Sequence, residues 1–309
     1  MTRMRSFARP TLLALLATLA AAAPATPAPP GFAFLQVPAG ARASSMAGAY
    51  ASIARGAEAA LWNPAGLEAT QRFELSGSHA ELEPKLRHDA VALAGRAWGG
   101  GYALSLRALY SDAIESRDEL GNLVGSFGAH DLEFGLSYGH SLGAGLAIGG
   151  SAQVVRERIA DLAAQTYSFD VGATLQPAAL PGSRVSLGLE NLGPPAHYTL
   201  DGSPGDDVGL PAGVHGGFSL GRLVGNGLTL RGALEGTFTV GRSGVGGLGA
   251  EVTNLGGASL RAGWRIHDAS TGLTLGAGFD SKVLRFDYAF IPLELDRGES
   301  HRFSIARQF

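Results

Sequence analysis

The most constraining feature of this sequence is a two-residue alternation of apolar and polar side chains that recurs along most of its length. In residues 258–266, ASLRAGWRI, apolar Ala, Leu, Ala, Trp and Ile alternate with Ser, Arg, Gly and Arg. Successive side chains of a strand point to opposite faces, so this period predicts strands with one apolar and one polar face. About fourteen segments, bounded by turn residues, follow the pattern. They lie near residues 72–80, 88–97, 101–110, 131–142, 145–156, 165–176, 183–190, 212–221, 227–238, 245–253, 258–268, 271–280, 283–290 and 301–309.

The number and spacing of these segments predict an all-β fold, a transmembrane antiparallel β-barrel of about fourteen strands. An even count returns the last strand to the side where the first began, as bacterial outer-membrane barrels require. The two longest connections, near residues 111–130 and 191–211, follow the third and seventh segments. These odd connections are extracellular in a barrel with a periplasmic N-terminus, where long loops are tolerated. The connection PAALPG, residues 177–182, is intermediate in length and fits less well.

The N-terminus has the pattern of an export signal. Three arginines in MTRMRSFARP precede the apolar run TLLALLATLAAAA, and small residues suited to cleavage follow. A membrane anchor is the alternative, but the run at 11–23 is shorter than the roughly 20 residues that a spanning helix needs. We therefore expect a signal peptide at residues 1–25, a Pro-rich linker at 26–31, and Sec export to the outer membrane of a Gram-negative bacterium.

The last segment runs to the final residue, Phe309. In lipid every backbone donor and acceptor needs a partner within the protein, so the last strand of a barrel must pair with the first. We expect the barrel to comprise residues 67–309. The terminal Phe309 resembles the C-terminal signal by which the barrel-assembly machinery recognises its clients.

A soluble exported β-sandwich is the alternative fold, because its strands alternate as well. Charged residues in the middle of the segments are compatible with bulk solvent or with a wet lumen. The strand count, the loop asymmetry, the export signal and the aromatic terminus together favour the barrel. The charged residues concerned are Arg107, Glu133, Asp170, Glu235, Arg261, Arg265, Arg285 and Asp287.

Residues 32–66 depart from the alternation and predict an N-terminal helical hatch, or plug. Apolar residues at 46, 50, 53, 57 and 61 have the spacing of one helix face. The following NPAG predicts a corner into the first strand, because Pro64 disfavours a helical Asn63 and Gly66 accommodates a positive φ. The residues expected to face the lumen or a ligand are Met46, Tyr50, Ile53, Leu61, Asn63 and Pro64.

Residue types needed for most enzymatic chemistry are absent or scattered. The chain has no Cys, which excludes disulfides, thiolate zinc sites and a cysteine nucleophile. Its eight His show no paired-ligand spacing, and no nucleophile elbow is visible. A net charge of −3 gives no sign of nucleic-acid binding. We therefore expect no catalytic residues, no metal and no cofactor, and a protein that is not an enzyme.

Several longer stretches resemble the PorV/PorQ family, which belongs with the FadL-type barrels. They span nearly the whole mature chain: FLQVPAGARASSMAGAYASIARGAEAALWNPAGL, RDELGNLVGSFGAHDLEFGLSYGHSLG, ENLG and FDYAFIPLELDRGESHRFSIARQF. The resemblance implies a fourteen-stranded outer-membrane barrel whose N-terminal segment enters the lumen. One departure is SSMAGA, where the family's GMGGA-like start keeps only Gly48.

The resemblance implies two functions and leaves a third open. FadL-type members pass small hydrophobic molecules through the outer membrane, and this is the expectation adopted here. PorV-type members hold C-terminal domains of type IX secretion substrates, which is the alternative. A lipase-like barrel enzyme is the third hypothesis. The expected partners are outer-membrane lipid and lipopolysaccharide, the assembly machinery through Phe309, and a hydrophobic solute or a secreted substrate domain.

Overall fold

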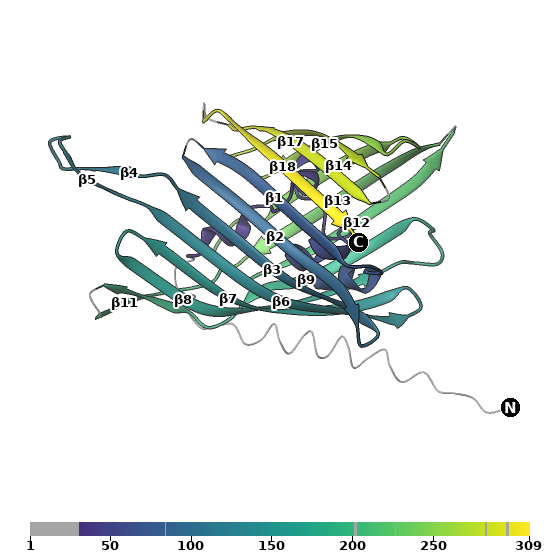
Figure 1. Ribbon diagram of the computed structural model, residues 1–309, viewed down its shortest axis with the longest axis horizontal. Coiled ribbons are helices and arrows are strands. Elements are labelled where there is room, and N and C mark those ends of the chain that lie inside the picture. Colours follow the sequence, from purple (N-terminus) through teal and green to yellow (C-terminus); the bar gives the residue numbers. More distant parts are fainter. Residues whose placement is uncertain (1–30, 84, 201–202, 226, 282, 295–296) are drawn as a thin grey trace.

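The computed structural model describes residues 31–309 except 84, 201–202, 226, 282 and 295–296. The expected signal peptide, and the linker apart from Gly31, lie outside the described residues. Strands occupy most of the described part (Figure 1).

Fourteen strands in the described ranges form one closed antiparallel barrel. Each pairs with its neighbours along the chain, β8 with β9 included, and the pairing of the first strand, β1, with the last, β18, closes the ring. The expected barrel of about fourteen strands is therefore confirmed, with each expected segment matched by one strand. The barrel strands are β1 (Glu74–Glu83), β2 (Leu86–Ala97), β3 (Gly100–Ser111), β6 (Ala129–Gly143), β7 (Leu146–Ile159), β8 (Leu162–Leu175), β9 (Ser183–Leu192), β12 (Gly213–Val224), β13 (Leu228–Thr239), β14 (Val245–Thr253), β15 (Ala258–Ile266), β16 (Leu273–Asp280), β17 (Leu284–Pro292) and β18 (Glu299–Gln308).

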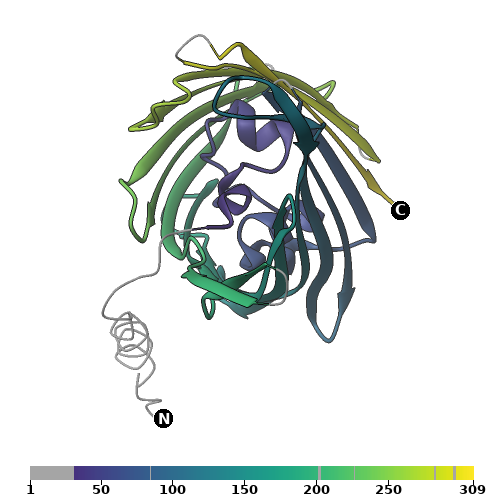
Figure 2. The ribbon, with the colours of Figure 1, turned by 90° about the vertical axis from the view of Figure 1, so that its left-hand side faces the viewer.

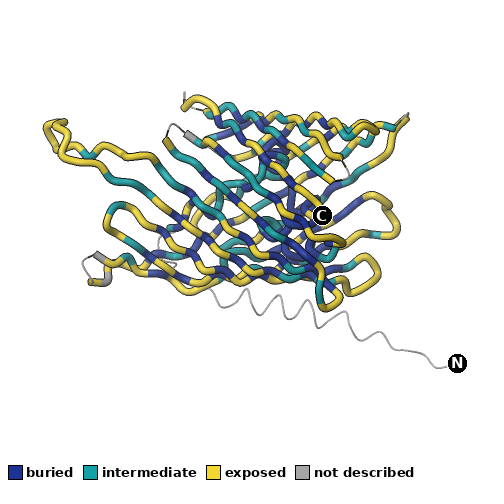
Figure 3. Tube along the Cα trace, viewed as in Figure 1, coloured by how far each residue is buried: buried dark blue, intermediate teal, exposed yellow. Residues whose placement is uncertain are grey.

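The two faces of the wall have the opposite polarity to those of a soluble protein. In β15, Leu260 is 70% exposed on the outside, whereas Arg261 is 5% exposed on the inside. In β6 the same holds for Phe134, which faces out, and Glu133, which is buried. Alternation of exposed and buried residues runs along the whole wall (Figure 3). A β-sandwich would bury its apolar face, so this pattern excludes it and is that of a barrel in lipid.

Connections are short at one end of the barrel and long at the other. At the short end, the β2–β3 turn places Trp98 and Gly99 at φ 52° and 79°, as a two-residue hairpin turn with positive φ requires. At the long end, the β3–β6 connection carries the hairpin β4 (Ile114–Arg117) and β5 (Leu123–Phe127), which projects beyond the barrel (Figure 1). The β9–β12 connection carries β10 (Ala196–Leu200) and β11 (Ser203–Val208), which extend the sheet beside β8.

Residues 31–70, called the plug below, lie inside the ring of strands (Figure 2). They contain four short helical elements: η1 (Ala33–Gln36), α2 (Ala41–Ser45), η2 (Gly56–Leu61) and η3 (Pro64–Ala69). Most side chains of the plug are buried. Among the described residues, no helix has the length and apolar character to cross a bilayer.

The expected single helix face from residue 46 to residue 61 is wrong. Ala47 and Gly48 take φ values of 55° and 78°, and Gly56 takes 61°, so the backbone turns left-handed twice within this stretch. Left-handed residues end a right-handed helix. The apolar residues still converge, but through tight turns held by the barrel wall rather than through helical spacing.

The expected role of NPAG as a corner leading out of a helix is also wrong. Asn63 has the extended geometry that the following proline favours (φ −152°, ψ 108°), but it begins η3 rather than ending a helix. Its side-chain oxygen accepts the backbone N–H of Ala65 at 3.0 Å, which caps η3. Gly66 does not have a positive φ. A Cβ there would collide with the backbone of Ala54, so close packing explains this glycine.

Candidate functional site

The end of the plug rests on a row of glycines in the wall. Gly139, Gly149 and Gly172 lie opposite one another on β6, β7 and β8. A Cβ at any of the three would collide with Asn63 or Pro64. Glycine therefore allows η3 to lie directly on the strand backbones. Asn63, which is 0% exposed, adds amide contacts of 3.4 Å to the carbonyls of Ala173 and Leu187.

The plug has its own small apolar core, closed by alanines of the wall. Met46 and Tyr50 are 0% and 1% exposed within this cluster. Tyr50 packs edge-on against Trp62 with ring centroids 5.6 Å apart. The wall contributes Ala92, Ala94, Ala103 and Ala233. Since these side chains are small, the plug approaches the wall closely on this side.

A network of buried charges joins the plug to β14, β15 and β17. Arg42 binds Glu251 through two contacts of 2.8 and 2.9 Å, and Arg261 binds the same carboxylate at 2.7 Å. Arg285 lies 2.6 Å from Glu58 of the plug. Arg261 and Arg285 also share Asp287, at 2.7 and 3.1 Å. Buried charges need such pairing, and here each pair ties the plug to the wall or braces a residue that does.

Tyr50 and Glu58 form a coupled pair within the plug. The Tyr50 hydroxyl donates to Glu58 at 2.6 Å. Burial, followed by the charge of Glu58, raises the pKa of Tyr50, so the hydroxyl keeps its proton. Burial acts to raise the pKa of Glu58, but Arg285, the Tyr50 hydrogen bond and Arg42 outweigh it and hold the pKa below its ordinary value of 4.5. Glu58 is therefore ionised at neutral pH.

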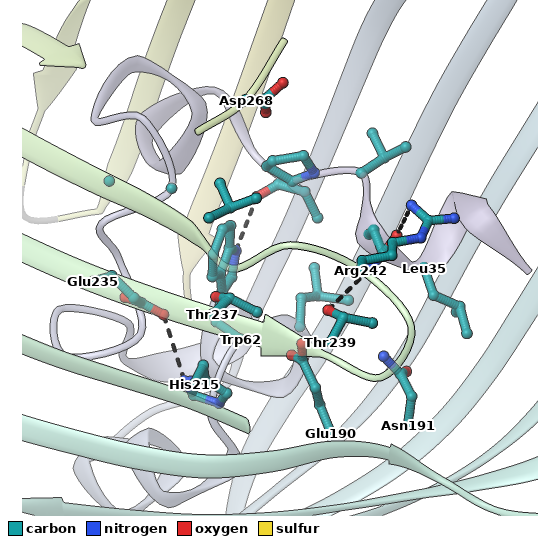
Figure 4. Close-up of a pocket in the computed structure, with 18 of the residues that line it drawn as sticks. Leu35, Trp62, Glu190, Asn191, His215, Glu235, Thr237, Thr239, Arg242 and Asp268 are labelled. Carbon is teal, nitrogen blue, oxygen red and sulfur yellow. Dashed lines mark hydrogen bonds and ion pairs between the residues drawn. The ribbon is translucent and has the colours of Figure 1, made fainter. Parts of the chain in front are cut away.

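A cavity of about 480 Å³ lies between the plug and the wall, toward the end with the long connections. Its floor is formed by plug residues, among them Leu35, Val37, Leu61 and Trp62. The wall contributes mostly polar side chains, several of which point into the space in Figure 4. These are Arg107, Glu133, Asp170, Glu190, Asn191, His215, Glu235, Thr237, Thr239, Arg242 and Asp268.

Glu235 lies between the cavity and the plug and contacts residues of both. One oxygen accepts the backbone N–H groups of Tyr50 and Ala51 at 3.0 and 2.8 Å. The other lies 3.4 Å from Nδ1 of His215 (Figure 4). The carboxylate therefore fixes a turn of the plug and orients a histidine in the same cavity.

The cavity reaches the wall where the β8–β9 ladder is interrupted. Phe169 pairs with Leu192 and Val171 with Leu189, so β9 carries one extra residue in between. Asn191, in this bulge, has a φ of 56° and donates its backbone N–H to Asp170 at 2.8 Å. Val171 and Leu189 both line the cavity, and Val171 is 50% exposed. Two apolar residues of the wall thus border the cavity beside this bulge.

The residues expected to face a ligand are divided among three places. Leu61 and Pro64 line the cavity just described. Tyr50 and Ile53 line a second space on the other side of the plug. Met46 and Asn63 are buried in packing contacts and line neither. Ligand contact by any of them stays a prediction.

Sequence reasoning assigned no site role to Trp62, His215 or Glu190. Trp62 directly precedes the NPAG stretch, residues 63–66. Its position between two apolar stretches is the only feature of the sequence that marks it. His215 and Glu190 lie on the polar face of their strands and are brought together by the register of β9 and β12. Within the described ranges, no group of three or more potential metal ligands is found.

The closed wall, its apolar outer face and the internal plug define a transmembrane β-barrel of the FadL-type fold. The "CymD monoaromatic hydrocarbon channel" matches with a TM-score of 0.60 and 14% identity, over 87% of this chain and 97% of that chain. The Pseudomonas putida toluene transporter TodX matches with a TM-score of 0.58 and 11% identity, over 86% and 98%. A Pseudomonas aeruginosa FadL homologue matches with a TM-score of 0.53 and 12% identity, over 91% of this chain and 98% of that chain. No protein-family model and no curated protein matches the sequence.

Proposed function

We propose that the chain is an outer-membrane channel that admits small hydrophobic molecules through its plugged lumen. The observation that carries this proposal is the 480 Å³ cavity between the plug and the wall, which has the size of small-molecule sites. The fold shared with proteins described as hydrocarbon channels and a toluene transporter supports it. A Gram-negative outer-membrane location after Sec export, and a role without enzymatic chemistry, belong to the same proposal.

The lining narrows the type of solute. A pure hydrocarbon would leave the Glu190 carboxylate, which has no hydrogen-bond partner among the described residues, without one in the occupied cavity, which is costly. A molecule with an apolar body and one hydrogen-bonding group would place its body on Leu61 and Trp62 and its polar group on the wall. Burial of the body contributes roughly 25 cal/mol per Å². The solute class we propose is therefore small, uncharged and amphipathic.

Tryptophan emission tests this proposal directly, with toluene and benzyl alcohol as a matched pair. Of the three tryptophans, Trp62 lines the cavity, whereas Trp98 and Trp264 are 85% and 54% exposed on the outside. We expect saturable quenching by both ligands, at lower concentration for benzyl alcohol. Trp62→Phe should abolish the quenching and Trp98→Phe should leave it. Quenching that persists in Trp62→Phe, or no quenching in the native protein, contradicts the proposal.

Docking of secreted domains is the second candidate, and one observation favours it. The projecting β4–β5 hairpin exposes Leu120, Leu123 and Val124 at 87%, 62% and 62%. Exposed apolar residues of this kind are typical of interaction surfaces. PorV/PorQ-type membership, inferred from the sequence stretches above, is part of the proposal under either candidate. The docking candidate would be favoured if the purified protein bound neither toluene nor benzyl alcohol but bound the C-terminal domain of a type IX substrate. Removal of residues 114–127 should then abolish binding of that domain.

A further inference from the structure

A second cavity, of about 360 Å³, lies on the opposite side of the plug. Gly182, from the β8–β9 connection, and Leu223 and Thr229, which flank the β12–β13 turn, place it at the end of the barrel with short connections. It shares no lining residue with the first cavity. Binding in this second cavity is therefore independent of the proposed channel function.

The lining of this second cavity is strongly cationic. Among the described residues, six arginines and one carboxylate, Glu58, line it. Glu58 is already engaged by Arg285 and by the Tyr50 hydroxyl, each at 2.6 Å. The arginines are Arg42, Arg55, Arg184, Arg222, Arg231 and Arg285. Positive charge thus exceeds negative charge at the cavity surface.

Arg184 holds a buried guanidinium whose donors are largely unused. Its side chain is only 4% exposed. Nη2 donates to Thr174 Oγ1 at 3.0 Å and lies 3.4 Å from Glu68. Nε and Nη1 are buried and have no hydrogen-bond partner among the described residues. Leaving charged donors unsatisfied in a buried place is costly, so this arrangement indicates a missing partner.

Arg55 adds a second unneutralised charge from the plug. It is exposed, it lines the same cavity, and no hydrogen bond or ion pair joins it to another described residue. Its charge repels that of Arg184. Arg231, on the neighbouring wall, is 3.4 Å from Glu251, a carboxylate that two other arginines bind more closely.

We propose that this cavity binds a phosphate group, with Arg184 and Arg55 as the principal donors and Arg231 as the third. Phosphate presents several acceptor oxygens and up to two negative charges, which suits three guanidinium groups that line one cavity from the plug, β9 and β13 better than a single carboxylate does. Inorganic phosphate and the headgroup of a phospholipid at this end of the barrel present the same chemistry. Phosphate here would also neutralise the repulsion between Arg55 and Arg184.

The test is calorimetric titration of the full-length mature protein in neutral detergent with inorganic phosphate. We expect saturable binding that weakens at least tenfold in Arg184→Gln and in Arg55→Gln. Arg72→Gln is the matched control, because Arg72 is exposed just before β1 and does not line the cavity. If Arg184→Gln fails to fold, Arg55→Gln carries the test, since Arg55 makes no described contact whose loss would unfold the protein.

A second arm distinguishes the two sources of phosphate. The protein is placed in nanodiscs of phosphatidylcholine with or without phosphatidic acid, and the phosphate titration is repeated. Competition by phosphatidic acid that Arg55→Gln relieves assigns the site to a lipid headgroup, and undiminished binding assigns it to a free solute. Absence of binding in both arms, or equal losses in Arg55→Gln and Arg72→Gln, overturns the proposal.

Discussion

Arg42 of the plug and Glu251 of β14 form a two-pronged ion pair, with Nη2 and Nε at 2.8 and 2.9 Å from the two carboxylate oxygens. The Glu251 side chain is 4% exposed and also receives Arg261. Planar guanidinium and carboxylate groups match in this geometry, which fixes orientation as well as distance. The pair therefore fixes Arg42 of the plug against β14.

Removing this carboxylate should loosen the plug. Glu251→Gln leaves Arg42 and Arg261 buried without their shared partner, which we expect to destabilise the plug by about 3–5 kcal/mol. Planar-bilayer recordings should show higher conductance, and limited proteolysis should cut the plug faster. Glu115→Gln is the control, because its pair with Arg117 is more than half exposed and such pairs contribute about 1 kcal/mol or less. Equal conductance of Glu251→Gln and the native protein would show that the pair does not hold the plug.

A single added side chain in the glycine row should displace the plug. Gly149→Val places a side chain where Pro64 lies, at a cost of about 1–3 kcal/mol for overpacking. The neighbouring Gly150 faces outward, where a Cβ meets only ordinary contacts, so Gly150→Val should be neutral. The measurements are the conductance and the thermal unfolding of the two variants, of which only Gly149→Val should differ from the native protein. Similar behaviour of both would place the plug elsewhere in the membrane-embedded protein.

Acid should release the plug before it unfolds the barrel. The pKa of Glu58 is held below its ordinary value of 4.5, so its contribution to stability is present above that value. It is lost as the pH falls through the lower pKa of the folded state. We expect plug proteolysis to accelerate below about pH 4.5, and to change less with pH in Glu58→Gln. A pH profile unaltered by that substitution would assign the acid response to other carboxylates.

Deletion of Phe309 should impair assembly and leave export intact. Phe309 donates its backbone N–H to Phe73 at 2.9 Å, and the two rings are 5.7 Å apart across the β1–β18 seam. Phe309 could act as a signal for the assembly machinery or as a contact that closes the β1–β18 seam. Phe73→Ala separates these two explanations, because it removes the ring contact but keeps the terminal residue. Assembly is measured by heat-modifiable mobility. Loss of assembly in the deletion alone supports recognition by the assembly machinery, equal loss in both variants supports the seam, and normal assembly of the deletion contradicts both.

The strands were predictable because each carries its own local signal. In β15 the contrast between Trp264 and Arg265 is present in the sequence and is the same contrast that lipid and lumen impose. The plug was predicted as a helix because spacing alone cannot reveal that Ala47 and Gly48 turn left-handed. That conformation is stabilised by contacts with the wall, which lie two hundred residues away in the chain.

The cavities could not be predicted for a related reason. His215 and Glu235 come from adjacent strands, but their convergence with Trp62 depends on how deep the plug sits. The unused donors of Arg184 are likewise visible only once the surroundings of its side chain are known. Sequence periodicity predicts which side chains face the lumen, but it does not predict which of these side chains come into contact with one another.

The two cavities described above lie on opposite sides of the plug and have no common lining residue, so the proposed solute site and the proposed phosphate site are separate. Substitutions around Trp62 therefore change the lining of the first cavity without touching the arginines of the second, and the reverse also holds. A sequence change in one cavity need not alter the other. The plug contributes residues to both cavities, so a change in its position would alter both.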